Sequence, residues 1–224
     1  EYRRQRQMCI RDRKMSMEKG GCRIKICGLV RIRDVEAVNR ARPDFAGFVF
    51  TESRRQVSAS LAAVLRRALD PRIPAVGVFV NAPIEEIVRL ADSGTIQMIQ
   101  LHGDENETYV GELKRRVQAP VIRAVRVRSP LDILEAEALP CDYLLLDTYT
   151  GGQYGGSGRT FDWGMIPALG KPYFLAGGIC EENVAQAVSH GPYALDVSSA
   201  VETGGKKDPE KIYRMVEAVR KAAE

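Results

Sequence analysis

The chain has 224 residues, a length that suits one or two ordinary domains or one α/β barrel. Hydrophobic residues make up 45% and charged residues 28% of it, as in a soluble globular protein, and no apolar run approaches the roughly 18 residues that a membrane span needs. The net charge is +4, and it comes entirely from residues 1–19, which hold seven basic and three acidic side chains. The rest of the chain is neutral overall and lacks the basic signature of a nucleic-acid-binding domain.

The basic N-terminal segment has neither clear helical periodicity nor the apolar core of a secretory signal. An arm that binds nucleic acid or a membrane is one interpretation. The segment reads more like a translated cloning or sequencing leader ahead of a start near Met15 or Met17. We therefore expect residues 1–20 to be a disordered leader foreign to the native protein, and residues 21–224 to form one domain.

The cysteines are scattered and form no C-x-x-C pair; they lie at positions 9, 22, 27, 141 and 180. The sequence contains only two histidines, so we expect no metal site and no bound cofactor. Free thiols are typical of a reducing compartment, which predicts a cytoplasmic protein.

Short apolar runs alternate with amphipathic stretches along the chain from residue 23. The runs expected to be strands are 24–27, 45–50, 75–80, 96–101, 120–127, 143–147, 172–176 and 193–197. The stretches expected to be helices are 34–42, 61–69, 81–90, 107–117, 130–138, 182–190 and 208–223. Asn81 and Asp208 are predicted N-caps, because each precedes a proline and a helical apolar stripe.

We interpret this alternation as eight strand–helix units, with no helix expected between the sixth and seventh strands, and such units pair their strands in parallel through right-handed crossovers. The strands are continuously apolar, as expected when both faces of a sheet are buried. A doubly wound open sheet is the competing architecture, but the chain carries no Rossmann fingerprint. We therefore predict an α/β fold, a single-domain (β/α)8 TIM barrel, whose active site would lie at the C-terminal ends of the strands.

Cys27 ends the first predicted strand. A lone strand cysteine is more often a small buried hydrophobe than a reactive group. Lys25 lies two residues earlier and so points to the same side of the strand. A nearby ammonium favours the thiolate, which makes Cys27 a candidate general base.

Asp147 ends the sixth predicted strand after three leucines. A charge in such surroundings would be poorly solvated, so the carboxyl could hold a proton near neutrality and act as a general acid. A helix cap or a salt-bridge partner is the alternative. The glycine-rich stretch 150–159 follows, and we expect a mobile loop able to close over a ligand, with a disordered insertion as the alternative.

The phosphate signal lies after the last two predicted strands. Gly177 and Gly178 follow the seventh, and Ser198 and Ser199 follow the eighth. In barrels of this type these two loops often bind phosphate through backbone N–H groups and a helix N-terminus. Gly-Gly alone would indicate only a tight turn; the two signals together predict a phosphate site.

Three further polar side chains fall at strand ends. His102 could donate a hydrogen bond to substrate or cap the next helix. Arg55 follows the second strand and could pair with a carboxylate, or be a solvated loop charge. Asp196, on the eighth strand, would face the same end of the barrel.

The sequence resembles the phosphoribosylanthranilate isomerase family of tryptophan biosynthesis over residues 23–224. The resemblance rests on seven motifs in order: Lys-Ile-Cys-Gly at 25–28, Gly-Phe-Val-Phe at 47–50, Gln-Leu-His-Gly at 100–103, Leu-Leu-Leu-Asp at 144–147, Gly-Gly-Ser-Gly-Arg-Thr-Phe-Asp-Trp at 155–163, Leu-Ala-Gly-Gly-Ile at 175–179 and Asp-Val-Ser-Ser-Ala-Val-Glu at 196–202.

The resemblance implies an Amadori rearrangement of N-(5-phosphoribosyl)anthranilate, with Asp147 as general acid and Cys27 as general base. It further implies that Arg55 faces the anthranilate end and that Asp196 lies near the substrate amine. The same comparison assigns the phosphate cradle to four residues: Gly177, Gly178, Ser198 and Ser199.

Two residues depart from the family pattern. Ala200 stands where the family usually has glycine, which would tighten the phosphate loop, and Arg54 replaces the common proline of a Ser-Pro-Arg pattern. Neither change removes a catalytic group.

Three other functions are alternatives to this interpretation of the sequence. They are a related aldose–ketose phosphosugar isomerase that uses paired aspartates, a non-catalytic phosphate-binding barrel, and a nucleic-acid binder that uses the basic tail. The expected partner is a small phosphoribosyl substrate, with no nucleic acid or membrane partner, and the expected state is a monomer or a homodimer.

Overall fold

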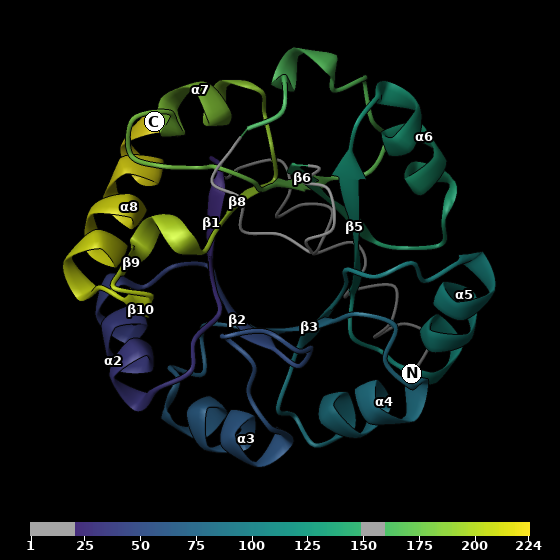
Figure 1. The fold of residues 1–224 in the computed structure, drawn as a ribbon, viewed down its shortest axis with the longest axis horizontal. Coiled ribbons are helices and arrows are strands. Elements are labelled where there is room, and N and C mark those ends of the chain that lie inside the picture. The colour runs from purple at the N-terminus through teal and green to yellow at the C-terminus, as the bar shows by residue number, and fades with distance from the viewer. Residues whose placement is uncertain (1–20, 149–159) are drawn as a thin grey trace, which may run out of the picture.

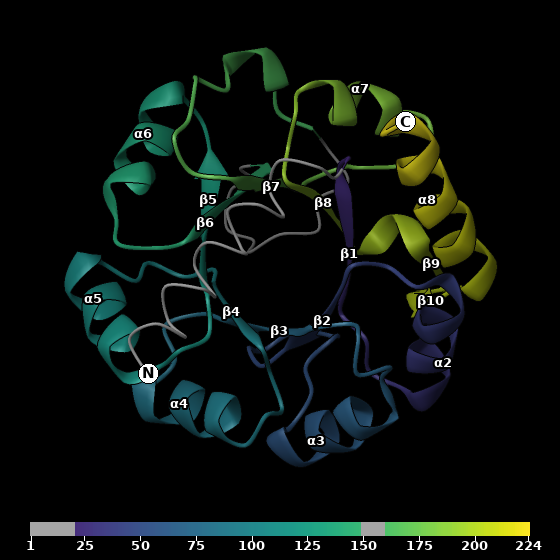
Figure 2. The same cartoon turned by 180° about the vertical axis from the view of Figure 1, so that it is seen from behind.

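The computed structural model describes residues 21–148 and 160–224. Eight parallel strands close into a barrel in chain order, and β8 pairs back onto β1, which confirms the predicted barrel and excludes an open sheet (Figures 1 and 2). The strands are β1 (Arg23–Cys27), β2 (Phe45–Val49), β3 (Ala75–Phe79), β4 (Met98–Leu101), β5 (Val121–Val127), β6 (Tyr143–Thr148), β7 (Tyr173–Leu175) and β8 (Ala194–Val197).

The helices form a ring outside the barrel (Figure 1). They are α2 (Ile32–Ala41), α3 (Ala59–Ala68), α4 (Ile84–Asp92), α5 (Glu107–Arg116), α6 (Pro130–Ala138), α7 (Val184–Ser189) and α8 (Pro209–Ala222). Short 3-10 helices, η1 (Trp163–Met165) and η2 (Ser199–Val201), follow β6 and β8, and a two-stranded hairpin, β9 (Glu202–Thr203) and β10 (Lys206–Lys207), precedes α8. None of the helices in the described ranges is long and apolar enough to cross a bilayer.

The helix caps explain where several helices begin. Asp208 caps α8 as predicted, since its carboxylate accepts the backbone N–H groups of Glu210 and Lys211. The prediction for α4 was wrong: the helix begins at Ile84, and Asn81 adopts a left-handed backbone with φ of 50°. The Asn81 side chain instead accepts a hydrogen bond from the backbone N–H of Asp104. It thereby links the loop after β3 to the loop after β4.

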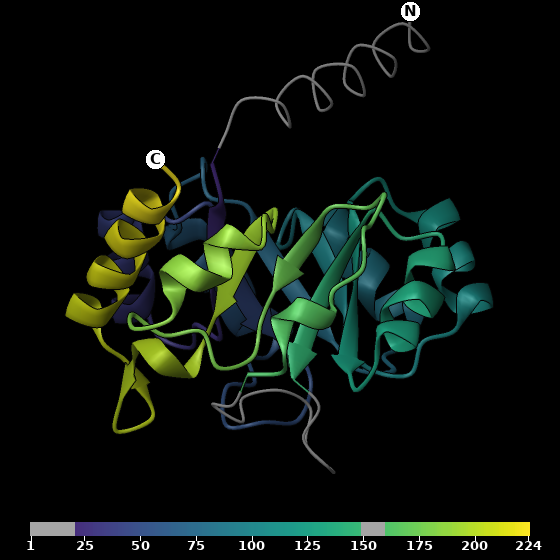
Figure 3. The ribbon, with the colours of Figure 1, turned by 90° about the horizontal axis from the view of Figure 1, so that it is seen from above.

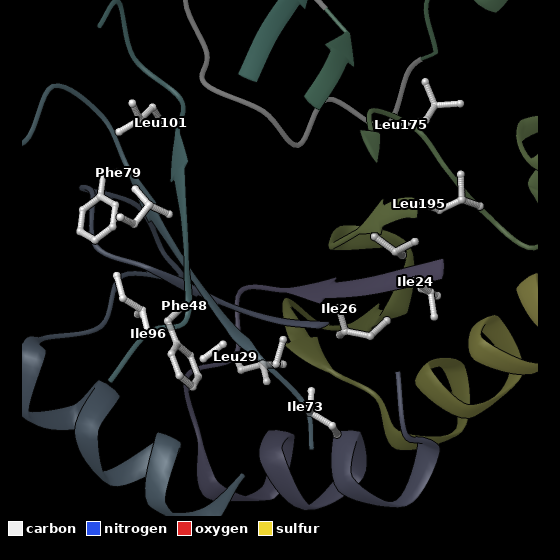
Figure 4. Packing of buried hydrophobic residues seen from close by; sticks show 14 of the residues in the cluster. Ile24, Ile26, Leu29, Phe48, Ile73, Phe79, Ile96, Leu101, Leu175 and Leu195 are labelled. Atoms are coloured by element: carbon white, nitrogen blue, oxygen red, sulfur yellow. The ribbon is translucent and has the colours of Figure 1, made fainter. Parts of the chain in front are cut away.

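Apolar side chains pack in two separate clusters. The larger one lies between the strands and the surrounding helices; Figure 4 shows Leu29, Phe48 and Ile73 in this layer. The smaller one fills the barrel interior and consists of Phe45, Val76, Met98, Ile122, Ala124, Leu145, Phe174, Ala176 and Ala194. Because successive strand residues point to opposite faces, β2 to β8 contribute to both clusters, whereas β1 contributes Ile24 and Ile26 to the larger cluster only.

The barrel interior changes character along the strands. Leu145 and Ala194 belong to the interior apolar cluster, whereas Asp147 and Asp196, two residues further along the same strands, are polar. Figure 3 shows the strands pointing toward the end of the barrel where the β9–β10 hairpin lies, opposite the C-terminus. An apolar floor therefore supports a polar layer at the C-terminal ends of the strands, where such barrels hold their active sites.

Candidate active site

One pocket, with about 930 Å³ of empty space, opens at the C-terminal ends of the strands. The structure brings all nine predicted site residues together in the lining of this pocket: Cys27, Arg55, His102, Asp147, Gly177, Gly178, Asp196, Ser198 and Ser199. The strand periodicity that predicted a common face is thereby confirmed, although the lining alone assigns no role to any of these side chains.

Cys27 lies at the end of β1 with 8% of its surface exposed. Gly47 on β2 makes room for it, since a Cβ at position 47 would lie 2.7 Å from the Cys27 Sγ. Burial raises the pKa of the thiol; the Lys25 ammonium opposes this rise, and the Asp196 carboxylate adds to it. Lys25 therefore favours the thiolate as predicted, but burial outweighs it, and the pKa of the thiol lies above its ordinary value.

Lys25 is fully buried inside the barrel. Its ammonium donates to Asp196 Oδ2 at 3.0 Å and to Gln100 Oε1 at 2.5 Å. Burial alone would lower the pKa of Lys25, but the interactions with the Asp196 carboxylate and with Cys27 outweigh it, and the pKa lies above its ordinary value. The lysine is therefore a fixed positive charge beneath the pocket.

Asp147 lies at the end of β6 and is 4% exposed. Its Oδ1 accepts the backbone N–H of Thr148 at 2.8 Å, and its Oδ2 lies 3.4 Å from His102 Nε2. Gly177 packs directly against this pair, because a Cβ there would lie 2.4 Å from Thr148 Oγ1 and 2.8 Å from Asp147 Oδ1. The carboxyl is therefore held rigidly, with backbone close on one side and an imidazole on the other.

The loop after β7 has the backbone expected of an anion cradle. Gly177 and Gly178 have φ values of 79° and 69°, which L side chains rarely adopt. Asn183 fixes the loop, since its amide donates to Gly178 O at 2.8 Å and its carbonyl accepts the Cys180 N–H at 2.9 Å. The helix that follows is shorter than predicted and begins at Val184.

The loop after β8 lines the same pocket. The hydroxyl of Ser198 donates to the backbone carbonyl of Cys27 at 3.1 Å, so this side chain ties β8 to β1. Ser199 and Ala200 lie in η2, and both line the pocket. A phosphate contact from Ser198 would therefore come from its backbone N–H more readily than from its hydroxyl.

Arg55 is positioned by a carboxylate that follows β8. Its Nε and Nη2 donate to Glu202 Oε1 and Oε2 at 2.7 and 3.1 Å, a two-pronged pair. Arg54 also reaches Glu202, at 2.9 Å. Within the described residues no hydrogen bond is made by Arg55 Nη1, the nitrogen left for an anionic ligand group.

Three residues at this site received no role in the sequence analysis: Gln100, Glu202 and Lys207. Lys207 is buried, and its ammonium donates to Ser198 O and to Glu202 Oε1, both at 2.8 Å. Burial lowers the pKa of Lys207 even though Glu202 opposes the change. The sequence position of Gln100 could have predicted it as a site residue, because it lies two residues before His102 and so faces the same side of β4. No feature of the sequence predicted the hairpin that carries Glu202 and Lys207.

The predicted mobile loop at 150–159 lies outside the described residues. Among the residues that are described, no group of three or more His, Cys, Asp or Glu side chains could hold a metal ion. The cysteines in that part of the chain are all free thiols.

Comparison with known proteins identifies the family. Residues 24–218 match the model of N-(5'phosphoribosyl)anthranilate (PRA) isomerase. The N-(5'-phosphoribosyl)anthranilate isomerase of Endomicrobium trichonymphae is 47% identical over 199 residues, which cover 88% of this chain and 98% of the relative. The phosphoribosyl anthranilate isomerase structure from Thermus thermophilus has a TM-score of 0.77 and 33% identity, covering 88% of this chain and 98% of its own.

A second structure of this kind was solved with a ligand. It is a phosphoribosyl anthranilate isomerase in complex with reduced 1-(o-carboxyphenylamino)-1-deoxyribulose 5-phosphate, with a TM-score of 0.74 and 31% identity, covering 89% of this chain and 99% of that chain. The family model and the relative each extend over most of the barrel described above. The chain belongs to the N-(5'-phosphoribosyl)anthranilate isomerase family.

Proposed function

We propose that this chain catalyses the Amadori rearrangement of N-(5-phosphoribosyl)anthranilate to 1-(2-carboxyphenylamino)-1-deoxyribulose 5-phosphate, with Asp147 as general acid and Cys27 as general base. One observation carries the proposal: a buried carboxyl, a buried thiol and a glycine cradle line the same pocket. An aldose–ketose rearrangement needs one group that gives a proton to oxygen and another that takes one from carbon.

The acid step opens the sugar ring. Asp147 transfers its proton to the ring oxygen, the bond between that oxygen and C1′ breaks, and a protonated Schiff base forms at C1′. The carboxylate left behind receives the backbone N–H of Thr148, at 2.8 Å from Oδ1. A preorganised donor at the position where charge develops lowers the barrier to this transfer.

The base step forms the enolamine. Cys27 removes the proton from C2′, and the electron pair of that C–H bond moves toward the cationic nitrogen. Tautomerisation of the enolamine to the ketone completes the isomerisation with no net gain or loss of atoms. Burial raises the pKa of this thiol. The step therefore requires either a pH above neutrality or a change, on substrate binding, in the charges around the thiol that lowers its pKa.

The remaining pocket residues would hold the two ends of the substrate. The positive-φ glycines and the backbone of Ser198 and Ser199 suit a phosphate group. Arg55 suits the anthranilate carboxylate. His102 and Asp196 lie between these ends, near the reacting carbons and the amine.

The test is turnover of N-(5-phosphoribosyl)anthranilate by the purified chain, followed by chromatographic separation of the product, and complementation of a tryptophan auxotroph that lacks this step. Cys27→Ala and Asp147→Asn should each abolish turnover. Cys141→Ala is a matched control for the first variant, because Cys141 is also buried but lies outside the pocket.

Asp142→Asn is the matched control for the second variant, because Asp142 lies at the other end of β6 and pairs with Lys114. Turnover in both Cys27→Ala and Asp147→Asn would refute the mechanism. If the enzyme isomerised a different phosphosugar and not this substrate, the related aldose–ketose isomerase would be favoured instead.

We also infer that residues 21–224 are the catalytic domain, that residues 1–20 take no part in it, and that the enzyme works in the cytoplasm as a monomer or a homodimer. The free thiols support a reducing compartment. Deletion of residues 1–20 should leave turnover unchanged, and sedimentation of the shortened chain would distinguish the two oligomeric states.

A further inference from the structure

A row of buried polar side chains crosses the barrel interior beneath the pocket. Asp196 on β8 accepts from Lys25 on β1, and Lys25 also donates to Gln100 on β4. Gln100 Nε2 lies 2.9 Å from His102 Nδ1, and His102 Nε2 lies 3.4 Å from Asp147 Oδ2. Lys25 is fully buried and Gln100 is 1% exposed, so water does not offer these groups other partners.

The donors and acceptors of Lys25 and Gln100 determine the orientation of the Gln100 amide and the tautomer of His102. An ammonium group has only donors, so the Gln100 atom facing Lys25 must be the carbonyl oxygen. The amide nitrogen, which also has only donors, then faces His102. Nδ1 of the imidazole must therefore accept, since a proton on Nδ1 would bring two N–H groups against each other at 2.9 Å.

We propose that Gln100 is a positioning residue that fixes His102 as the Nε2–H tautomer and thereby aims a hydrogen-bond donor at the carboxyl of Asp147. The imidazole tautomer is otherwise set by whichever partner the ring finds. Here the Lys25 ammonium fixes the orientation of the Gln100 amide, and that amide fixes the tautomer of His102. The buried ammonium on β1 therefore determines which group His102 presents to the carboxyl on β6.

Nε2 of His102 is placed to donate a hydrogen bond to Asp147. Nε2 is buried and makes no hydrogen bond of good geometry within the described residues, while Oδ2 of Asp147 lies within reach. This inference rests on the proposed role of Asp147 as the acid. When Asp147 gives up its proton, the N–H of His102 faces the new negative charge, whereas the opposite tautomer would present a lone pair to it.

The row also explains why a glutamine suits this position. A glutamate would offer acceptors to both Lys25 and His102, and the proton on the imidazole would then move to Nδ1. Nε2 would become an acceptor facing Asp147. Gln100→Glu therefore reverses the tautomer with almost no change in side-chain volume.

The direct test is nitrogen NMR of the full chain with ¹⁵N-labelled histidine. The sequence contains only two histidines, so the spectrum holds two imidazoles, and a His190→Gln variant assigns them. We expect His102 to show a protonated Nε2 and an unprotonated Nδ1 near neutral pH. Gln100→Glu should exchange these two signals and lower kcat at least about tenfold, on the scale of losing a donor that stabilises developing charge.

Gln97→Glu is the matched control. Gln97 precedes the same strand, but its side chain bonds to the backbone of Ala75 and Gly94, away from the pocket lining. It should leave both the His102 signals and kcat unchanged. A protonated Nδ1 on His102 in the wild-type protein would overturn the inference, as would a Gln100→Glu variant with unaltered signals and kcat.

The outcomes separate this inference from the proposed function. The wild-type tautomer is read without substrate and does not depend on whether Gln100→Glu folds. If Asp147→Asn retained turnover, the acid assignment would fall while the tautomer stood. If turnover were lost in Asp147→Asn but His102 carried its proton on Nδ1, the isomerase mechanism would stand and the role of Gln100 would be refuted.

Discussion

Glu202 is the carboxylate most strongly committed to its charged form at this site, and its replacement by glutamine makes a quantitative prediction. The side chain is 5% exposed and pairs with Arg55 and Lys207. Burial alone would raise its pKa, but the hydrogen bonds and charges of Arg55 and Lys207 outweigh burial and lower the pKa from 4.5 to about 2.

The size of the effect follows from linkage. A carboxyl whose pKa falls from 4.5 to about 2 on folding contributes at most about 3 kcal/mol to the free energy of unfolding. This contribution is present above the unfolded pKa of 4.5 and is lost as the pH falls through about 2. The burial cost of Lys207 is the same in both proteins, so we expect Glu202→Gln to lower the free energy of unfolding by about 3 kcal/mol near neutral pH.

Urea unfolding of the two proteins between about pH 7 and about pH 2.5 measures this difference. The fluorescence of Trp163, a buried residue and the one tryptophan of the sequence, reports the transition. The gap between the proteins should narrow below about pH 4.5, because the carboxyl of the unfolded wild-type chain then takes up a proton that the folded protein, with its lowered pKa, does not yet bind.

Glu181→Gln is the control, since Glu181 pairs with Arg214 at the surface and such pairs are worth about 0–1 kcal/mol. A gap between wild type and Glu202→Gln that stayed constant from about pH 7 to about pH 2.5 would refute the argument.

Other predictions concern the base, the loop after β7 and the buried ammonium. Because burial raises the pKa of the Cys27 thiol, kcat/KM of the free enzyme should rise with pH above neutrality, and a flat profile to about pH 9 would argue against a thiolate base. Gly177→Ala should lower kcat at least about tenfold, because its Cβ would lie 2.4 Å from Thr148 Oγ1. Gly191→Ala, with φ of 68° and open space around it, should show only the backbone cost of about 1 kcal/mol in thermal unfolding. Lys25→Met should lower the free energy of unfolding by about 3–5 kcal/mol, since it leaves a buried carboxylate unpaired, and chemical denaturation checks this value.

The barrel was predictable because its signal is local and repeated. Each strand is a short apolar run beside amphipathic helices, and eight such units without a Rossmann fingerprint favour closure over an open sheet. The boundaries were less secure where a loop imitates a helix start, as at Asn81, whose side chain bonds to Asp104 rather than to the first turn of α4. A capping residue and a loop-bridging residue have the same sequence signature.

The site was predictable where the important residues stand at strand ends. Cys27 and Asp147 end β1 and β6, so position alone placed them at one opening. The protonation of Cys27 was harder to predict, because it depends on how burial and neighbouring charges from several strands balance. Lys207 was not predictable as a site residue, since its contacts with Ser198 and Glu202 depend on the hairpin between η2 and α8.

That hairpin gives the two ends of the pocket a common support. Glu202 begins β9 and holds Arg55, while Lys207 ends β10 and holds the backbone carbonyl of Ser198 in the predicted phosphate loop. The two hairpin residues also pair with each other at 2.8 Å. Because the same buried ion pair sustains both contacts, a shift at either end of the pocket would disturb the other. The hairpin that follows β8 therefore links the Arg55 side chain to the backbone of Ser198 through one buried ion pair.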